Sequence, residues 1–180
     1  LIANRGEIAV RIIRACKELG IQSVAIHSDV DSDAMHVKLA DESICVGGAI
    51  PSSSYLNIPN IMSAINITGA EAVHPGYGFL SENDKFANIL YKHDVKFIGP
   101  SSKSILELGN KSNALSLANK YKLPILGNPE AKNIKDTADA LKIAKSIGFP
   151  VVIKAAYGGG GKGMRVFNNE NEIKQFFQQL

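Results

Sequence analysis

The chain has 180 residues, of which 45% are hydrophobic and 21% are charged, a balance typical of a globular protein and not of a disordered one. The net charge of +3 comes from lysines and arginines scattered among acidic residues, so it does not indicate a nucleic-acid-binding protein. No apolar run is long enough to cross a membrane, and two cysteines without CxxC spacing fit a reducing compartment, so we expect a cytoplasmic protein.

The first hundred residues alternate short β-type runs with helical periods, which predicts a parallel sheet flanked by helices. Strands are expected at residues 1–3, 22–27, 43–46, 71–74 and 96–98, and helices at 7–19, 58–67 and 83–93, with a short helix ending at Ala40. The apolar stripe of the first helix is expected to comprise Ile8, Ile12, Ala15, Cys16 and Leu19. We expect both Cys16 and Cys45 to be buried.

The sequence pattern changes after Pro100. Two helices are expected there, at 103–108 and 113–120, and they predict a connector between two structural units. We place the domain boundary at Gly109, giving domains 1–109 and 110–180. In the second domain, Asp136 is expected to cap a helix at 136–147, which strands at 150–155 and 164–167 and a helix at 170–180 follow. The chain has no initial Met and ends inside this last helix, so we expect it to be a piece of a longer protein.

The loop between the last two strands holds four consecutive glycines, Gly158 to Gly161, followed by Lys162 and Gly163. Ordering glycine costs more backbone entropy than ordering other residues, so such a run indicates a sharp curve or a close approach to a ligand. Its backbone N–H groups could line an anion site, and Lys154 and Lys162 could add charge. A flexible hairpin tip with solvated lysines explains the loop equally well.

Three other glycine motifs fit this loop poorly. A Walker A loop requires Ser or Thr after its lysine, whereas Gly163 follows Lys162. The spacing GxGxxG is present, but a dinucleotide fingerprint opens a helix and residues 164–167 are strand-like. In a protein kinase the lysine lies on a later strand, whereas Lys154 precedes the glycines. The remaining order of parts is that of an ATP-grasp flap.

Three segments resemble the biotin carboxylase family: IANRGEIA at residues 2–9, HPGYGFLSEN at 74–83, and IKA at 153–155 with GGGGKGMR at 158–165. Residues 39–42 and 54–59 are similar to the bacterial acetyl-CoA carboxylase version, so the resemblance covers nearly the whole chain. Tyr157 departs from the most glycine-rich versions of the flap. The resemblance implies an α/β fold, with a Rossmann-like (pre-ATP-grasp) domain followed by the start of an ATP-grasp domain.

The resemblance also implies a reaction: ATP-dependent carboxylation of biotin on the biotin carboxyl carrier protein, with bicarbonate, through carboxyphosphate. This is the first half-reaction of acetyl-CoA carboxylase in fatty acid synthesis. The implied cofactors are ATP and Mg²⁺ or Mn²⁺, with biotin as carrier-bound substrate. A carboxyltransferase component and a second copy of the subunit are implied partners, and the helix with Arg14 and Glu18 resembles the family's dimer-contact helix.

The resemblance assigns roles to few residues of this chain. Tyr77 and Glu82 would face the active site. The residues implied in ATP binding are Lys111, Lys154, Gly158, Gly159, Gly160, Gly161, Lys162, Gly163 and Met164. The metal ligands, the adenine pocket and the groups that bind bicarbonate and biotin are expected beyond Leu180, so we expect the 180-residue chain to be inactive by itself.

The residues alone also support structural interpretations of the same side chains. Arg5 and Glu7 could form a local ion pair or helix cap, and His74 could be a packed strand-end residue. Ser81 could cap the next helix, with Glu82 near that helix's positive end. By composition alone, Lys111 is an exposed helix residue.

Other functions remain as alternatives. The chain could be the biotin carboxylase portion of a propionyl-CoA, methylcrotonyl-CoA or pyruvate carboxylase. It could also belong to another ATP-grasp ligase, such as a carbamoyl-phosphate synthetase or a purine-pathway carboxylase. A non-catalytic binding module is the alternative outside enzymes.

Overall fold

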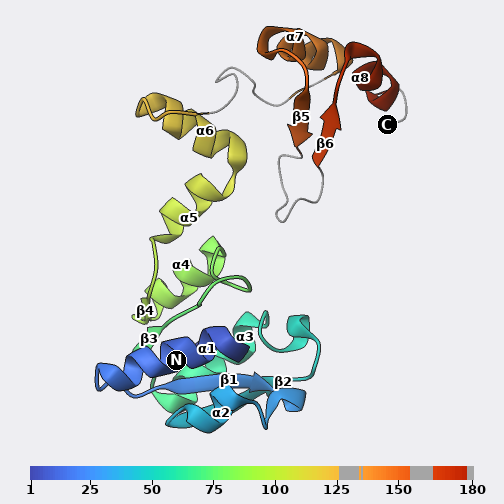
Figure 1. The fold of residues 1–180 in the computed structure, drawn as a ribbon. Helices are drawn as coiled ribbons and strands as arrows, with labels where there is room; N and C mark the ends of the chain where they lie inside the picture. The colour runs from blue at the N-terminus through green and yellow to red at the C-terminus, as the bar shows by residue number, and fades with distance from the viewer. Residues whose placement is uncertain (126–133, 135, 155–163, 178–180) are drawn as a thin grey trace. The chain divides into compact units, whose positions relative to one another are not determined.

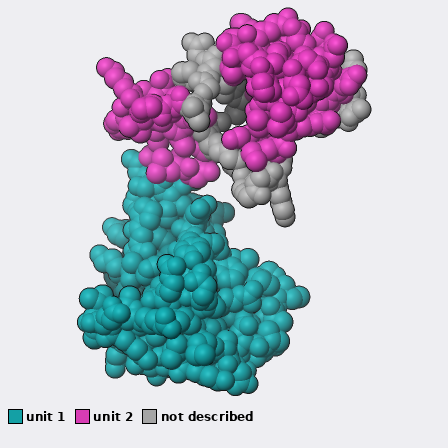
Figure 2. Space-filling model, viewed as in Figure 1, with its two compact units in different colours: residues 1–106 teal, residues 107–180 magenta. Residues whose placement is uncertain are grey.

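A computed structural model describes residues 1–125, 134, 136–154 and 164–177, apart from the side chains of residues 111 and 112 (Figure 1). The chain divides into two compact units, residues 1–106 and 107–180, which are coloured teal and magenta in Figure 2.

Unit 1 alternates strands with helices, as the sequence pattern predicts. Its elements are α1 (Gly6–Glu18), β1 (Val24–Ser28), the 3₁₀ helix η1 (Asp29–Asp31), α2 (Met35–Leu39), β2 (Glu42–Gly47), the 3₁₀ helix η2 (Pro51–Ser53), α3 (Ile58–Thr68), β3 (Ala72–Val73), α4 (Asp84–Lys92), β4 (Lys96–Phe97) and the beginning of α5 (Ser102–Gly109). The α/β fold class is confirmed.

The first three residues connect two parallel strand pairs into one sheet. β1 pairs with β2, and β3 pairs with β4, both in parallel. Ile2 forms parallel bridges to Ala25 in β1 and to His74 directly after β3. The spatial order is therefore β2, β1, residues 1–3, β3, β4, so the first segment of the chain lies at the centre of the sheet.

Two clusters of buried side chains hold unit 1 together. The larger cluster packs α3 and α4 against the strands through residues that include Ile26, Ile65, Val73 and Phe86. The smaller one joins Ile2 to Ala9 and Ile13 of α1, with Leu39 of α2 packed against it. Removal of these apolar surfaces from water is the main force that holds the helices on the sheet.

The buried side of α1 differs from the predicted stripe. Ala9 and Ile13 are its buried residues, while Ala15 is exposed and Leu19 is 73% exposed. Apolar residues occur on several sides of this helix, so their periodicity does not determine which side faces the sheet. The choice depends on where Ile2 and α2 lie.

The prediction that both cysteines are buried is wrong for Cys45. Cys16 is partly buried, whereas Cys45 is exposed. Successive side chains of a strand point to opposite faces of the sheet. In β2 the inward face holds Val46 and the partly buried Ile44, which leaves Cys45 on the outer face.

Unit 2 contains α6 (Lys111–Lys120), α7 (Thr137–Ile147), β5 (Val151–Lys154), β6 (Met164–Phe167) and α8 (Glu170–Phe177). β5 and β6 pair in antiparallel fashion, which confirms the predicted strand, loop, strand arrangement. The Asp136 Oδ1 atom accepts a hydrogen bond from Asp139 N at 2.8 Å and so caps α7, as predicted. Among the described helices, none is long and apolar enough to span a membrane.

His36 is a buried histidine in the core of unit 1. His36 is only 1% exposed, and its Nε2 atom lies 3.2 Å from the Ile26 carbonyl oxygen. A carbonyl only accepts hydrogen bonds, so Nε2 carries the proton and Nδ1 is bare; within the described part of the chain Nδ1 has no partner. Burial lowers the pKa of His36, because the imidazolium would have to leave water.

We therefore expect unit 1 to lose stability as the pH falls below about 6.5, the ordinary pKa of an unfolded histidine. Below that pH the unfolded chain takes up a proton that folded His36 resists, so the free energy of unfolding falls by up to about 1.4 kcal/mol per pH unit, until the lower native pKa is reached. His36→Gln keeps a donor for Ile26 and should flatten this slope. Urea unfolding at several pH values measures it.

His74 contributes to the same slope, because burial lowers its pKa as well. His74→Asn keeps an acceptor near Gly76 N and serves as the second single variant. The double variant should have the smallest slope. An unchanged slope in His36→Gln would contradict the role assigned to His36.

Candidate functional site

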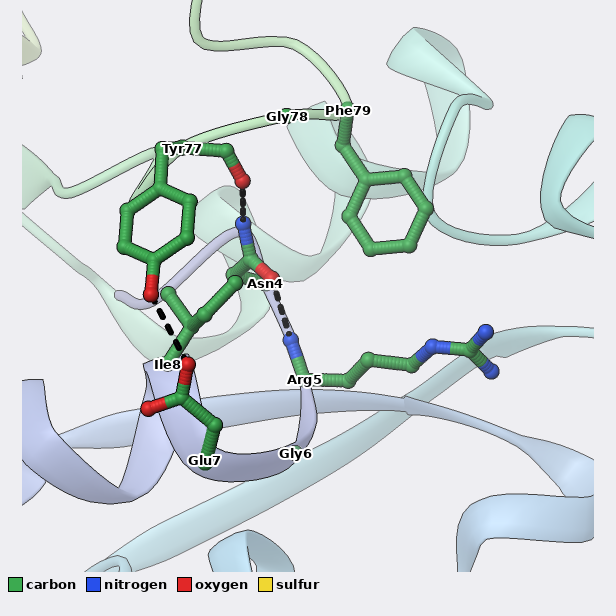
Figure 3. A pocket seen from close by; sticks show the side chains of 8 residues that line it. All are labelled: Asn4, Arg5, Gly6, Glu7, Ile8, Tyr77, Gly78 and Phe79. Atoms are coloured by element: carbon green, nitrogen blue, oxygen red, sulfur yellow. Dashed lines mark hydrogen bonds between the residues drawn. The ribbon is translucent and has the colours of Figure 1, made fainter. Parts of the chain in front are cut away.

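Two loops of unit 1 leave the carboxyl ends of neighbouring parallel strands. Residues 4–6 follow the first strand segment, and residues 75–79 follow β3. The first segment has the second strand of the chain on one side and the fourth on the other, so the strand order reverses here. Open α/β sheets bind ligands at this topological switch point. A pocket of about 360 Å³ lies at it, lined by Asn4, Arg5, Gly6, Glu7, Ile8, Tyr77, Gly78 and Phe79 (Figure 3).

Asn4 ties the two loops together. Its Nδ2 atom donates to the carbonyl oxygens of Pro75 at 2.8 Å and Tyr77 at 3.0 Å. Its Oδ1 atom accepts from the backbone N–H of Arg5 at 2.9 Å. Asn4 is only 1% exposed; its hydrogen bond to Pro75 is buried, and those with Tyr77 and Arg5 are part-buried. The sequence signal for this residue is its position directly after a strand end, but its partners could not be inferred from the sequence.

Gly76 and His74 allow the loop at residues 75–79 to approach Asn4. Gly76 has a φ of +63°, and a Cβ atom there would lie 2.8 Å from Asn4 Nδ2 and 2.7 Å from Ile8 Cγ2. Any side chain would therefore push the loop away. His74 Nδ1 accepts from Gly76 N at 3.0 Å, which confirms the interpretation of His74 as a hydrogen-bonded strand-end residue.

Tyr77 extends over the pocket and meets the start of α1. Its hydroxyl group donates to Glu7 Oε1 at 2.8 Å, as the dashed line in Figure 3 shows. This hydrogen bond raises the pKa of Tyr77, because the phenolate would face the carboxylate of Glu7. The predicted site residue Tyr77 thus lines the pocket, with its side chain 53% exposed.

Arg5 and Glu7 do not form the local ion pair that the sequence suggested. The Arg5 Nη1 atom lies 3.2 Å from Asp31 Oδ2, and Glu7 lies 3.9 Å from Arg11 instead. Residue 31 follows β1, the strand next to the first segment in the sheet, so its proximity to Arg5 depends on strand order. Sequence distance alone gave no sign of it.

An aromatic and acidic cluster holds the Arg5 side chain at the pocket wall. The guanidinium carbon lies 5.2 Å from the ring centre of Tyr55 and 5.7 Å from that of Phe79, and the two rings stack. The Tyr55 hydroxyl donates to Asp31 Oδ2 at 2.6 Å and accepts from Ser28 N at 3.0 Å. Burial and the Asp31 contact raise the pKa of Tyr55 to about 12, and the Tyr55 hydrogen bond is the main reason that the pKa of Asp31 is lowered.

The structure corrects the assignment of the helix cap after this loop. Asn83, rather than Ser81, is the N-cap of α4, and its Oδ1 accepts from Phe86 N at 2.8 Å. The helix begins at Asp84, one residue later than predicted, and Leu80 in the preceding loop is buried in the core. Glu82 is exposed beside this cap and does not line the pocket.

Only some of the unit 2 residues that we predict to bind the nucleotide lie in the described part of the chain. Lys154 is exposed at the end of β5, opposite Met164 of β6. Lys111 begins α6, but its side chain lies outside the described set. Outside the described residues lie Gly158, Gly159, Gly160, Gly161, Lys162 and Gly163.

The β5–β6 hairpin presents one apolar face beside Lys154. Val152 pairs with Val166 and Lys154 pairs with Met164, and all four are exposed. The alternate residues, Val151 and Phe167, are buried against α7 and α8. A strand lysine next to an uncovered apolar surface has the chemistry to hold a phosphate and a flat heterocycle. Across the described ranges, no group of three or more acidic, histidine or cysteine side chains could hold a metal ion.

Family models match the whole chain. The model described as "Biotin carboxylase, N-terminal domain" matches residues 1–105. The model described as "Carbamoyl-phosphate synthase L chain, ATP binding domain" matches residues 101–180.

Similar proteins are much longer than this chain. The mitochondrial propionyl-CoA carboxylase alpha chain of Homo sapiens is 52% identical over 178 residues, which are 99% of this chain and 24% of that protein. A biotin carboxylase of Nostoc sp. is 50% identical over 98% of this chain and 39% of its own length. The chain thus spans between about a quarter and two fifths of such relatives.

Two solved structures share the fold. A Campylobacter jejuni biotin carboxylase in a beta-gamma-ATP complex has a TM-score of 0.91 and 46% identity, over 99% of this chain and 40% of that one. The biotin carboxylase domain dimer of Hydrogenobacter thermophilus 2-oxoglutarate carboxylase, in complex with MgADP, ADP and bicarbonate, has a TM-score of 0.89 and 45% identity, over 99% and 39%.

The Tyr55 hydroxyl is expected to stabilise the pocket wall. Tyr55→Phe removes the acceptor of the fully buried Ser28 N–H and the donor to Asp31, which should lower the free energy of unfolding by about 1–3 kcal/mol. Tyr91→Phe, at a residue 81% exposed, is the matched control and should change it by less than about 0.5 kcal/mol. Denaturant unfolding of the chain measures both, and equal effects would refute the assignment.

Proposed function

Because the chain belongs to the biotin carboxylase family, we propose that it forms part of an enzyme that carboxylates biotin at the expense of ATP. A bicarbonate oxygen attacks the γ-phosphorus of ATP, and ADP leaves, giving carboxyphosphate. Cleavage of its C–O bond releases carbon dioxide and phosphate. The ureido nitrogen of biotin gives its proton to the released phosphate and forms a C–N bond with the carbon dioxide.

The β5–β6 hairpin of unit 2 carries the proposal for the nucleotide. Phosphoryl transfer depends mostly on positioning and on neutralising developing negative charge. Lys154, with Met164 as its strand partner, would contact phosphate oxygens. We propose the same phosphate-binding role for Lys111 and for residues 158–163, with domain limits at 1–109 and 110–180.

The pocket of unit 1 is proposed to face the reacting molecules. Tyr77 offers an exposed aromatic ring and a hydroxyl group at the switch point of the sheet, where ligands bind in such folds. Glu82 lies outside the pocket lining but is exposed further along the same loop, and it is proposed as a second group that faces the active site. The neighbour that holds bicarbonate and MgADP supports bicarbonate as a substrate and Mg²⁺ (or Mn²⁺) as the nucleotide's counter-ion.

The acyl acceptor and partners are further proposals. We propose acetyl-CoA as the final acceptor, since residues 39–42 and 54–59 resemble the bacterial acetyl-CoA carboxylase version. Propionyl-CoA is the second candidate, favoured by the 52% identity to a propionyl-CoA carboxylase chain. A biotin carboxyl carrier protein, a carboxyltransferase component and a second copy through Arg14 and Glu18 of α1 are the proposed partners, in the cytoplasm.

Another ATP-grasp ligase is a weaker candidate. The carbamoyl-phosphate synthase model matches only residues 101–180, whereas the biotin carboxylase model matches residues 1–105, which carry the loop with Tyr77. The match over the first unit therefore favours biotin as the acceptor of the activated carbon.

Lys154→Gln tests the nucleotide site in the complete protein that contains this chain. Loss of a charge-assisted contact to phosphate should raise the Kd for MgATP about tenfold or more, which corresponds to at least about 1.4 kcal/mol. Calorimetric titration measures this Kd. Lys142→Gln, at an exposed lysine of α7, makes the same charge change as a matched control and should leave the Kd within twofold. Equal Kd values for parent and Lys154→Gln would remove Lys154 from the site.

The isolated 180-residue chain should not catalyse the reaction. It covers 39% of the length of a biotin carboxylase relative, and its described residues include no cluster of three or more His, Cys, Asp or Glu side chains that could hold a metal ion. We expect no bicarbonate-dependent release of phosphate from ATP by the purified chain in a coupled phosphate assay. Turnover above that of Lys154→Gln in the same chain would overturn this expectation.

A further inference from the structure

Packing against neighbouring side chains does not fix the direction in which the Tyr77 side chain points. The residue is 53% exposed, and its side-chain hydrogen bond to Glu7 is also exposed to water. Exposed polar contacts stabilise a side-chain position only weakly, because water competes for both groups. The position of Tyr77 therefore depends on what holds the backbone beneath it.

Asn4 holds that backbone by hydrogen bonds. Both hydrogen bonds from Asn4 Nδ2 end on carbonyl oxygens of the loop, one at Tyr77 itself and one at Pro75. The contact with Arg5 N–H fixes which end of the amide is oxygen, because an N–H group needs an acceptor. Figure 3 shows the amide of Asn4 pointing at the Tyr77 backbone while the Tyr77 ring lies over Glu7.

Asn4 and Glu7 come from the same short segment at the start of α1. Asn4 holds the loop backbone, and Glu7, three positions later, receives the hydroxyl at 2.8 Å. Gly76 permits this approach, since a Cβ atom at that position would lie 2.8 Å from Asn4 Nδ2. The loop thus has one backbone anchor and one side-chain anchor, both on the strand-to-helix turn.

We propose that Asn4 is a positioning residue of the candidate site, which acts on the reaction by fixing the backbone that carries Tyr77. Its effect on catalysis rests on the proposed function, whereas its effect on the loop does not. A residue that only stabilises unit 1 would lower activity regardless of what stands at position 77. A residue that acts through Tyr77 loses its effect when the Tyr77 side chain is absent.

Asn4→Asp is the primary variant, to be made in the complete protein. The carboxylate keeps the acceptor for Arg5 N–H but places an oxygen against the carbonyls of Pro75 and Tyr77, so the loop should detach. We expect kcat/KM for biotin to fall at least tenfold. In a Tyr77→Ala background, the same substitution should change kcat/KM less than twofold. If Asn4→Asp lowers kcat/KM by the same factor in the Tyr77→Ala background as in the parent, the proposal is overturned.

Asn60→Asp is the matched control. Asn60 Nδ2 donates to the Val46 carbonyl at 2.8 Å in the same unit, away from the pocket, so Asn60→Asp also replaces an amide donor to a backbone carbonyl with a carboxylate, here at an exposed residue. Its kcat/KM should stay within twofold of the parent. If Asn4→Asp does not fold, Gly76→Ala displaces the loop by another route and should also lower kcat/KM at least tenfold. Parental kinetics in a folded Gly76→Ala would count against the proposal.

Amide hydrogen exchange separates this proposal from the proposed function. In the 180-residue chain, Asn4→Asp should speed exchange of the Gly76 amide at least tenfold, and Asn60→Asp should not change it. If the complete protein carboxylates no biotin, the proposed function fails, and the exchange result still decides whether Asn4 holds the loop. Parental exchange at Gly76 in Asn4→Asp would refute the anchor itself.

Discussion

The pairing of residues 1–3 with strands on both sides is the constraint on which unit 1 depends. Ile2 N donates to Val24 O at 2.8 Å and Ala3 N to His74 O at 2.9 Å, so the first segment joins β1 and β3 into one parallel sheet. Parallel strands end at the same edge, and the loops that follow them meet there. This is why Asn4 can bond to Pro75, 71 positions away in the sequence.

The polar groups around the pocket differ in how free they are to meet a ligand. Asn4 has both its donors and its acceptor engaged by backbone. The charge of Arg5 is neutralised by Asp31, and its guanidinium group lies over two aromatic rings. Its charge therefore stabilises the wall of the pocket. Tyr77 is an exposed polar side chain whose backbone Asn4 holds. A fixed backbone that carries an exposed group is an arrangement that suits a substrate-facing loop.

The two units support different parts of the proposed chemistry. Unit 2 presents a strand lysine beside an apolar hairpin face, which suits a nucleotide, and its family model is that of an ATP-binding domain. Unit 1 presents a pocket at the switch point of a parallel sheet.

The sequence by itself determined the order of helices and strands, the parallel character of the first sheet, the Asp136 cap and the family, because these depend on local patterns and motifs. The tertiary structure decided which side of α1 is buried, that Asn83 rather than Ser81 caps α4, that Cys45 is exposed, and that Arg5 pairs with Asp31. It also places Asn4 between the two loops. The Asn83 cap is a local contact to Phe86 N, three positions along the chain. The other features depend on how helices and strands pack, and contacts between distant residues form only once the sheet is assembled.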